Sequence, residues 1–229
     1  MADDSTSRRG LRRKAYRLFA AAFLVMSALF FGTAGTLAYW EAWVYMGVLL
    51  IPMAFALQYL LKNSPDLLER RFQHREREQA QKRLIASSWI YFLVAFGLPG
   101  LDHRFGWSSV PVAVVLAADL VVFLGYMLIL RVFRENQYAA RTVQVEDRQS
   151  VITTGPYAVV RHPMYVGVLT MYLLSPLALG SYWALLPAAA IVPILVVRIM
   201  NEELVLERDL AGYAEYRLKT KYRLVPGVW

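Results

Sequence analysis

The hydrophobic residues of this chain gather in long continuous runs that are separated by short polar or charged segments. A helix needs roughly 20 apolar residues to cross the hydrocarbon core of a bilayer. Runs of about that size cover residues 18–37, 43–61, 84–101, 110–130, 163–179 and 182–197. The last two are shorter, and only Gly180 and Ser181 lie between them. The pattern predicts an all-α integral membrane protein with five to six transmembrane helices, the last two forming a tight hairpin.

The basic residues are distributed unevenly among the segments that separate these runs. Of the 25 Lys and Arg residues, 24 precede the first run, lie between the second and third or the fourth and fifth, or follow the sixth; Arg104 is the exception. Because loops rich in Lys and Arg stay in the cytoplasm, both termini are expected to be cytoplasmic. The first run has no small-residue cleavage site before Trp40, which favours an uncleaved span over a signal peptide.

Composition and motifs exclude several classes of function. The chain is 58% hydrophobic and 18% charged, whereas soluble domains are about 45–50% apolar and about 25% charged. Cysteine is absent, which excludes disulfides, thiolate metal sites and cysteine nucleophiles. The net charge of +8 fits a membrane surface better than a nucleic acid, because the basic residues flank apolar runs. No metal-binding H-E-x-x-H, P-loop or G-x-G-x-x-G motif occurs, so neither a metal nor a Rossmann cofactor site is expected.

Residues 132–162 form a long polar connector, and candidate chemistry gathers at its end. A residue before proline avoids the helical region, so His162 should lie just outside a helix that begins at Pro163. The N-terminus of such a helix can bind an anion, and Arg161 would be a further donor. Gly167, one turn into the helix, would allow a backbone or a ligand to approach closely. These residues alone equally fit a connector whose arginine contacts lipid headgroups.

Two further features involve charged residues next to or inside the apolar runs. Arg198 and Glu202 are four residues apart, so they share one face of a helix at the inner end of the sixth run. On their own they also fit an ordinary surface ion pair. Asp119 lies inside the fourth run, where a carboxylate is costly and usually faces the protein interior. It fits either a hydrogen-bonded packing residue or a neutral acid.

Three strings in the C-terminal part carry a family resemblance: GPYAVVRHPMYVG (155–167), RIMNEELVLE (198–207) and GYAEYRLKTKYRLVPG (212–227). They resemble the isoprenylcysteine carboxyl methyltransferase family of integral membrane methyltransferases, which is allied to the phospholipid N-methyltransferases. The resemblance covers about 144–227. It implies a catalytic region over 132–229 that follows a four-helix region over 1–131 within one structural domain. It also implies a cytoplasmic pocket, built from the 132–162 connector and the C-terminal helix, for S-adenosyl-L-methionine and its product S-adenosyl-L-homocysteine.

The resemblance also implies roles for individual residues. Arg198 would bind the substrate, and Arg198 and Glu202 would be the catalytic residues. The residues expected to bind the cofactor are Gln144, Gln149, Ser150, Val151, Ile152, Tyr157, His162, Pro163, Tyr165 and Glu202.

The implied function is methyl transfer to a lipophilic acceptor at the inner leaflet, with the carboxylate of an isoprenylcysteine-like or isoprenoid substrate as the first choice. Such a carboxylate is already ionised at neutral pH, and Arg198 could bind it through a charge-assisted contact. A compact catalytic core of this kind is typical of a prokaryotic inner membrane. The alternatives are a phospholipid, amine or thiol methyltransferase, an NADPH-dependent membrane sterol or isoprenoid reductase, and a non-enzymatic scaffold or transporter subunit.

Overall fold

The computed structural model describes the backbone of residues 2–72, 79–139 and 149–229, and the side chains of residues 9–69, 71–72, 92–139 and 149–229. Its helices are α1 (Ala2–Ala34), α2 (Trp40–Asn63), α3 (Pro65–Arg71), α4 (Gln79–Phe105), α5 (Val112–Glu135), the 3₁₀ helix η1 (Gly155–Ala158), α6 (Pro163–Ala178), α7 (Leu185–Ala189), α8 (Ile191–Asp209) and α9 (Tyr213–Lys219). No strand occurs in the described residues. The prediction of an all-α protein is therefore confirmed.

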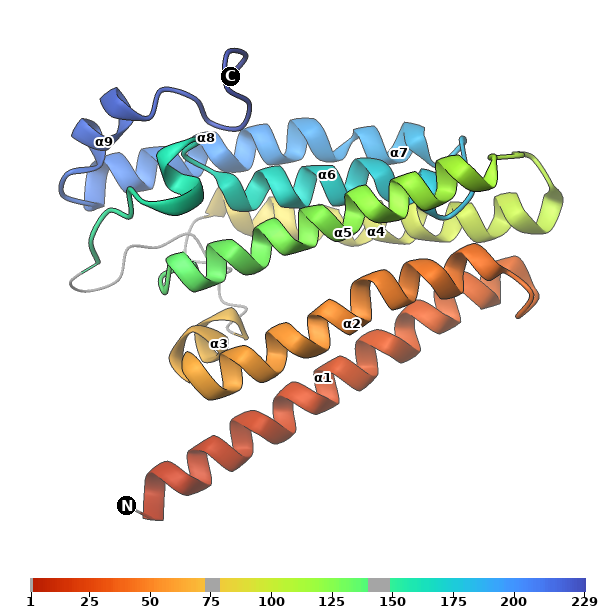
Figure 1. Cartoon of the computed structure of the whole chain (residues 1–229), viewed down its shortest axis with the longest axis horizontal. Coiled ribbons are helices and arrows are strands. Elements are labelled where there is room, and N and C mark those ends of the chain that lie inside the picture. The colour runs from red at the N-terminus through yellow and green to blue at the C-terminus, as the bar shows by residue number, and fades with distance from the viewer. Residues whose placement is uncertain (1, 73–78, 140–148) are drawn as a thin grey trace.

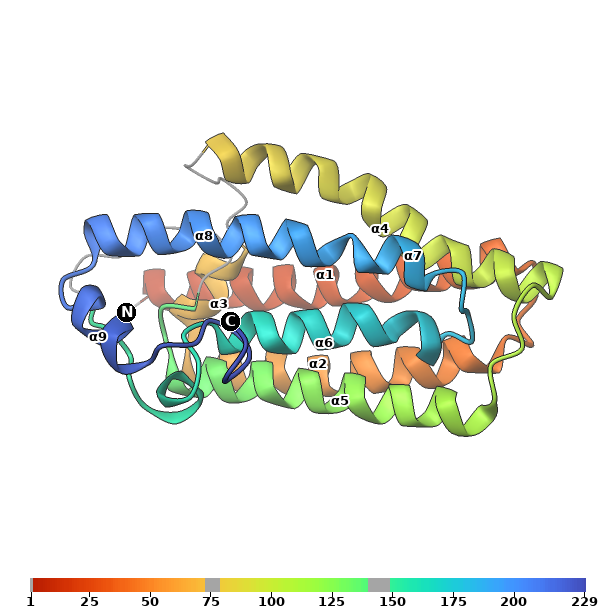
Figure 2. The ribbon, with the colours of Figure 1, turned by 90° about the horizontal axis from the view of Figure 1, so that it is seen from above.

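The apolar runs become the long helices of the bundle. Within the described side chains, Arg9–Ala34, Trp40–Asn63 and Val112–Glu135 are long and apolar enough to cross a membrane, and Pro163–Ala178 is a shorter apolar helix. The sixth predicted run does not form a single helix, because it is divided between α7 and the first turns of α8. After α6 the chain turns at Gly180, whose φ of 69° is readily adopted only by glycine. Helices α7 and α8 then run back beside α6, as the predicted hairpin requires (Figure 2).

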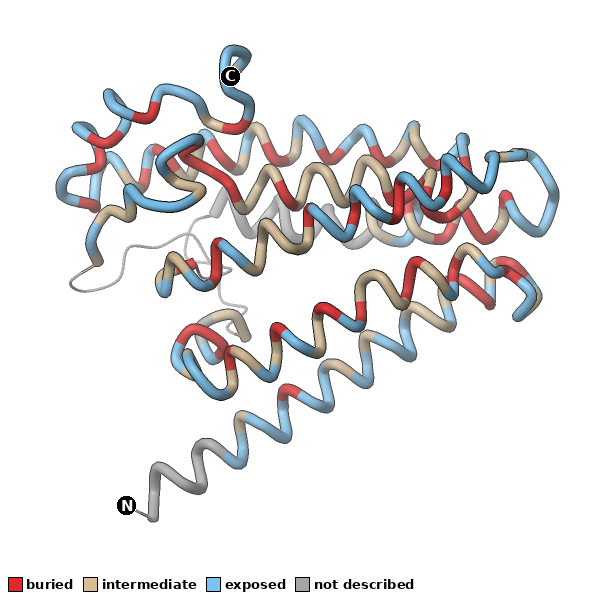
Figure 3. The backbone as a smooth tube through the Cα atoms, viewed as in Figure 1, coloured by how far each residue is buried: buried red, intermediate tan, exposed pale blue. Residues whose placement is uncertain are grey.

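The two ends of the bundle differ in character (Figure 1). One end carries α3, η1, α9 and the start of α1, together with the segments that lead into and out of them. The other end carries the short connections between α1 and α2, α4 and α5, and α6 and α7. Buried residues lie mainly on the faces where the helices meet, whereas α1 is exposed along much of its length (Figure 3). The orientation of this bundle in the membrane stays a prediction.

Buried polar contacts join the short connections at the second end. Asp102, at the end of α4, accepts hydrogen bonds from the backbone N–H of Ser108 at 2.7 Å and from its hydroxyl at 2.6 Å. The Ser181 hydroxyl donates to the same carboxylate. The ring of Tyr39, before α2, stacks on His103 with 4.3 Å between centroids, and its hydroxyl donates to the carbonyl of Leu179. These contacts fix three helix connections relative to one another.

Asp119 is buried in α5, and neither of its carboxylate oxygens has a hydrogen-bond partner among the described residues. Burial of an ionised carboxylate without a partner is costly. Of the two interpretations of its sequence position, the hydrogen-bonded packing residue therefore finds no support among the described residues.

Helices α5 and α6 approach each other backbone to backbone at Gly125 and Gly167. A Cβ atom on Gly167 would lie 2.7 Å from the carbonyl oxygen of Gly125 and 2.8 Å from Cγ1 of Ile129. A Cβ atom on Gly125 would lie 3.1 Å from the carbonyl oxygen of Gly167. The close approach expected at Gly167 is confirmed, and the partner is the backbone of α5. This contact sets the position of the α6 N-terminus, which carries His162 and Tyr165.

Replacement of Gly167 by alanine should destabilise the protein, because the added methyl group would force α5 and α6 apart. Overpacking of this kind typically costs about 1–3 kcal/mol. The measurement is thermal unfolding in detergent. Gly47→Ala, in α2, is the matched control, since its Cβ would meet no atom within 4 Å and alanine is the better helix former. Equal unfolding temperatures for the two variants would contradict the proposed tight contact.

Candidate active site

A cavity lies at the end of the bundle that carries η1 and α9. The cavity is open to solvent, and its empty volume is about 870 Å³ when the open mouth is included. Its walls come from the N-terminus of α6, from residues 198–210 in and just after α8, from α9 and η1, and from the residues that precede η1 and follow α5. Its lining contains predicted site residues that lie far apart in the sequence: Gln149, Ser150, Val151, Ile152, Tyr157, His162, Pro163, Tyr165, Arg198 and Glu202.

Every predicted site residue that the structure describes therefore lines this one cavity. Gln144 lies outside the described residues. The roles assigned to these residues stay predictions, but their convergence satisfies the geometric requirement for a shared site.

Sequence reasoning did not select several other lining residues: Asn136, Tyr138, Ala139, Met164, Leu206, Leu210, Tyr213 and Tyr216. Leu206 and Leu210 lie four and eight residues after Glu202, so helical periodicity could have placed Leu206 on the same face. Ala139 is fixed through its carbonyl oxygen, which accepts a hydrogen bond of 2.8 Å from Arg71 of α3. The others follow only from how the chain folds around the end of the bundle.

The start of α6 forms as the sequence predicts, with His162 at the N-cap and Pro163 as the first helical residue. The preceding backbone pairs with the C-terminal segment of the chain. The N–H of Arg161 donates to the carbonyl of Tyr222 at 2.9 Å, and the N–H of His162 donates to that of Arg223 at 3.0 Å. The C-terminal segment is thus part of the site's framework.

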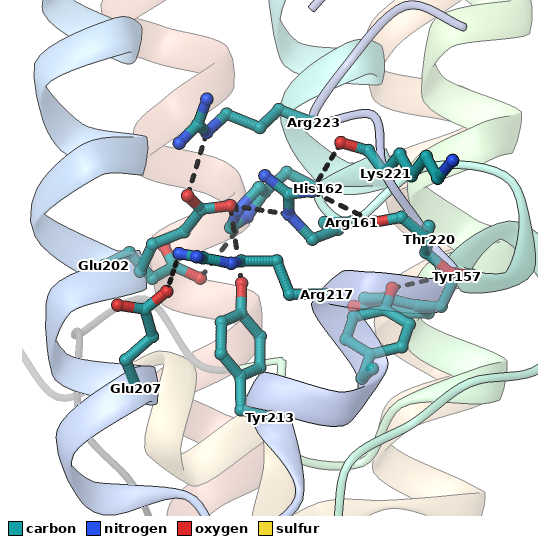
Figure 4. A network of polar contacts seen from close by, with 12 residues as sticks. Tyr157, Arg161, His162, Glu202, Glu207, Tyr213, Arg217, Thr220, Lys221 and Arg223 are labelled. Atoms are coloured by element: carbon teal, nitrogen blue, oxygen red, sulfur yellow. Dashed lines mark hydrogen bonds and ion pairs between the residues drawn. The ribbon is translucent and has the colours of Figure 1, made fainter.

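Arg161 differs from the expectation that it would add a donor for a bound anion. Its Nε donates to Oε1 of Glu203 at 2.7 Å, and its Nη1 donates to the carbonyl oxygens of Thr220 at 3.0 Å and Lys221 at 2.6 Å. The side chain is 4% exposed. Its guanidinium therefore holds the C-terminal segment against α8, as the dashed lines in Figure 4 show.

Glu203, which sequence reasoning did not assign a role, is the centre of this polar network. Its carboxylate accepts hydrogen bonds from Arg161, from Nε2 of His162 at 3.1 Å, from the hydroxyl of Tyr213 at 3.4 Å and from Nε of Arg223 at 2.8 Å. Burial raises the pKa of this carboxyl group, but the hydrogen bonds from His162, Arg161 and Arg223 outweigh burial and lower the pKa to about 2. Glu203 is therefore ionised at neutral pH.

The ionised Glu203 determines which nitrogen of His162 carries a proton. A carboxylate only accepts hydrogen bonds, so Nε2 of His162 must be the donor in their contact. The other ring nitrogen, Nδ1, lies 3.9 Å from Oε1 of Glu202. When the ring is neutral, Nδ1 is an acceptor, and the cavity wall then presents two neighbouring acceptors. Such a pair suits a ligand that carries N–H donors and a positive charge.

A second network joins Arg198 and Glu202 through α6. Nε of Arg198 donates to the hydroxyl of Tyr165 at 2.9 Å. That hydroxyl donates to Oε2 of Glu202 at 2.6 Å. The two charged residues lie on one face of α8, as their spacing predicts, and Tyr165 connects them. The cavity therefore offers a positive and a negative group a short distance apart.

Tyrosines and leucines form the less polar part of the wall. The hydroxyl of Tyr157 accepts a hydrogen bond of 2.8 Å from Asn136, and its carbonyl accepts one of 2.8 Å from the hydroxyl of Tyr216. The side chains of Tyr213 and Tyr216 pack with Leu206 and Leu210. A flat aromatic group could lie along this wall.

The segment that forms most of this cavity is similar to a known protein family. Residues 113–211 match the family model for phospholipid methyltransferase. The match confirms the predicted relation to membrane methyltransferases allied to the phospholipid N-methyltransferases. It runs from α5 to the residues just before α9 and so includes η1, α6 and α8. No curated protein matches the chain.

This similarity implies a methyltransferase activity. Phospholipid methyltransferases typically use S-adenosylmethionine. The apolar helices of the bundle agree with an integral membrane protein.

Replacement of Glu203 by glutamine should destabilise the protein, because two guanidinium groups would lose their buried partner. Breaking a buried ion pair typically costs about 3–5 kcal/mol. A carboxyl group whose pKa is lowered on folding stabilises the protein above its ordinary pKa of 4.5, and this contribution is lost as the pH falls towards 2. The difference in unfolding temperature between wild type and Glu203→Gln should therefore be constant above about pH 5 and shrink towards pH 2.

Thermal unfolding in non-ionic detergent across this pH range measures the effect. Glu207→Gln, one turn later on α8, is the control, because Glu207 pairs with Arg217 at the surface and surface pairs contribute about 0–1 kcal/mol. A difference between Glu203→Gln and wild type that does not change down to pH 2 would contradict the assigned ionisation.

Proposed function

We propose that this protein transfers a methyl group from S-adenosyl-L-methionine to a lipophilic acceptor at the inner leaflet of a prokaryotic inner membrane. The observation that carries the proposal is the single cavity in which Glu202, His162, Tyr165 and Arg198 meet. One part of its wall suits a cation and another suits an anion. The aromatic wall beside Tyr157 completes a site for a ligand with a charged end and a flat end.

The residues that line the cavity fit the chemical groups of the proposed cofactor. Its ammonium group matches the two acceptors, Oε1 of Glu202 and Nδ1 of His162. Its adenosine matches the wall that contains Tyr157, and residues 149–152 would line the same part of the cavity. When bound, the cofactor supplies a methyl group on a positively charged sulfur. The chain's own part is to orient the acceptor towards that methyl group, since correct positioning supplies much of the acceleration in such a transfer.

Arg198 would bind the acceptor if the acceptor is a carboxylate. A guanidinium group forms short, charge-assisted contacts with carboxylates and stays charged at any relevant pH. The carboxylate needs no general base, because it is ionised at neutral pH. Apolar side chains on the same stretch of α8 are exposed, namely those of Val197, Met200 and Leu204. A lipid tail could contact these side chains while its polar end lies near Arg198.

A second candidate acceptor is the amine of a phospholipid. The name of the matching family, phospholipid methyltransferase, favours it. An amine must lose a proton before it accepts a methyl group, and His162 or Glu202 would be the groups available in the cavity to take it. The same match supports a methyltransferase over the reductase and the non-enzymatic scaffold or transporter subunit.

S-adenosyl-L-homocysteine should bind to the purified protein in detergent, and NADPH should not compete with it. The Glu202→Gln variant should bind it about ten-fold or more weakly, because a hydrogen bond to a charged group contributes about 1.5–3 kcal/mol. Isothermal titration calorimetry measures both affinities. Glu207→Gln, outside the cavity on the same helix, should bind as wild type does. Binding of NADPH but not of S-adenosyl-L-homocysteine would contradict the proposal.

Transfer of tritium-labelled methyl groups to two probes distinguishes the acceptors. We expect labelling of N-acetyl-S-farnesylcysteine, and we expect Arg198→Gln to lower kcat/KM for it by about 10- to 100-fold through loss of a charge-assisted contact. The second probe is phosphatidylethanolamine in vesicles. Label on the phospholipid alone would replace the carboxylate acceptor with the amine. Label on neither probe would overturn both acceptor assignments. Cofactor binding would still be decided by the calorimetric measurement.

A further inference from the structure

Tyr165 lies between the residue proposed to bind the cofactor and the residue proposed to bind the acceptor. Its hydroxyl accepts from Arg198 at 2.9 Å and donates to Glu202 at 2.6 Å. Arg198 and Glu202 are one turn apart on α8, whereas Tyr165 reaches them from α6. All three side chains line the cavity. The hydroxyl is thus a physical connection between two parts of the site that have different charges.

The direction of the two hydrogen bonds is fixed by chemistry. A guanidinium group can only donate, and an ionised carboxylate can only accept. The proton of Tyr165 therefore points to Glu202, and its oxygen accepts from Arg198. Hydrogen bonds in such a chain polarise one another. The negative charge of Glu202 makes the phenol oxygen a better acceptor, and Arg198 is held more firmly as a result.

We propose that Tyr165 is a positioning residue that couples the binding of the cofactor to the binding of an anionic, lipophilic acceptor. This inference rests on the proposed function. When a ligand ammonium group pairs with Glu202, the Glu202 carboxylate accepts the hydrogen bond from the Tyr165 hydroxyl less strongly. The phenol oxygen then holds Arg198 less strongly, and more of the guanidinium charge is directed to the acceptor. By linkage, the acceptor must strengthen cofactor binding by the same factor.

Whether the two ligands are coupled depends on the charge of the acceptor. An anionic acceptor gains from a guanidinium group that is less engaged with Tyr165, so the two ligands should strengthen each other's binding. An uncharged acceptor of the same shape makes no ion pair with Arg198 and should show no coupling. Tyr165 would thus help to select a carboxylate over a neutral lipid once the cofactor is bound.

The experiment measures the affinity for S-adenosyl-L-homocysteine by calorimetry with and without a saturating probe, so that no turnover occurs. The probes are N-acetyl-S-farnesylcysteine, which is anionic, and its uncharged carboxamide. In the wild-type protein the anionic probe should tighten binding by about five-fold or more, in the range of ordinary coupling energies, and the carboxamide should leave it unchanged. We call the ratio of the affinities with and without the probe the coupling factor. In Tyr165→Phe the coupling factor for the anionic probe should fall to near one. Binding of S-adenosyl-L-homocysteine alone should weaken by less than about ten-fold, since the two hydrogen bonds that Tyr165 loses are to Arg198 and Glu202 and neither is to the ligand.

Tyr172→Phe is the matched control. Tyr172 lies two turns further along α6, where its ring packs edge-on against Phe92 and Phe96, so its loss of a hydroxyl should leave the coupling factor as in wild type. Glu202→Gln removes the charge at the end of the same chain and should also lower the factor, which keeps the test available if Tyr165→Phe does not fold.

Two results would overturn the inference: a factor of one in the wild-type protein, or an unchanged factor in Tyr165→Phe. Both are distinguishable from failure of the proposed function, which would appear first as wild-type protein that does not bind S-adenosyl-L-homocysteine at all.

Discussion

The buried carboxylate of Glu203 is the constraint on which the rest of the site depends. An unpaired charge inside a protein is very costly, so a buried carboxylate must be surrounded by donors. Its donors come from three separate parts of the chain: Arg161 and His162 before α6, Tyr213 of α9, and Arg223 near the C-terminus. To satisfy this one group, the chain must bring these parts together, and the cavity lies between them.

The two consecutive glutamates have different tasks because of helical geometry. Adjacent residues on an α-helix point about 100° apart, so Glu203 can face the interior while Glu202 faces the cavity. Glu203 fixes the ring of His162 through Nε2, and this leaves Nδ1 close to Glu202. Glu203 thus orients His162 beside Glu202, the carboxylate that faces the cavity. A change at Glu203 would therefore alter the cavity without any contact between Glu203 and a ligand.

The sequence predicts the parts of this structure that depend on local patterns. Long apolar runs predict the helices, the His162–Pro163 step predicts the start of α6, and the four-residue spacing of Arg198 and Glu202 predicts their common face. The division of the last run into α7 and α8 was not anticipated, because the whole run is apolar and periodicity alone does not show where a helix begins. Nor were Asn136 and Arg223 predicted, since their contacts join residues 20 or more positions apart and leave no local signal.

The position of the site at one end of the bundle follows from the two kinds of ligand that it is proposed to bind. Charged groups such as Arg198 and Glu202 line the open cavity there, whereas exposed apolar side chains of α8, such as Met200 and Leu204, are available beside them for a lipid tail. The contact between Gly125 and Gly167 links the apolar and polar parts of the structure, because it fixes the position of the start of α6 along α5. If α6 moved along α5, His162 and Tyr165 would leave their partners on α8 together. Helix packing in the apolar part therefore determines the geometry of the polar site.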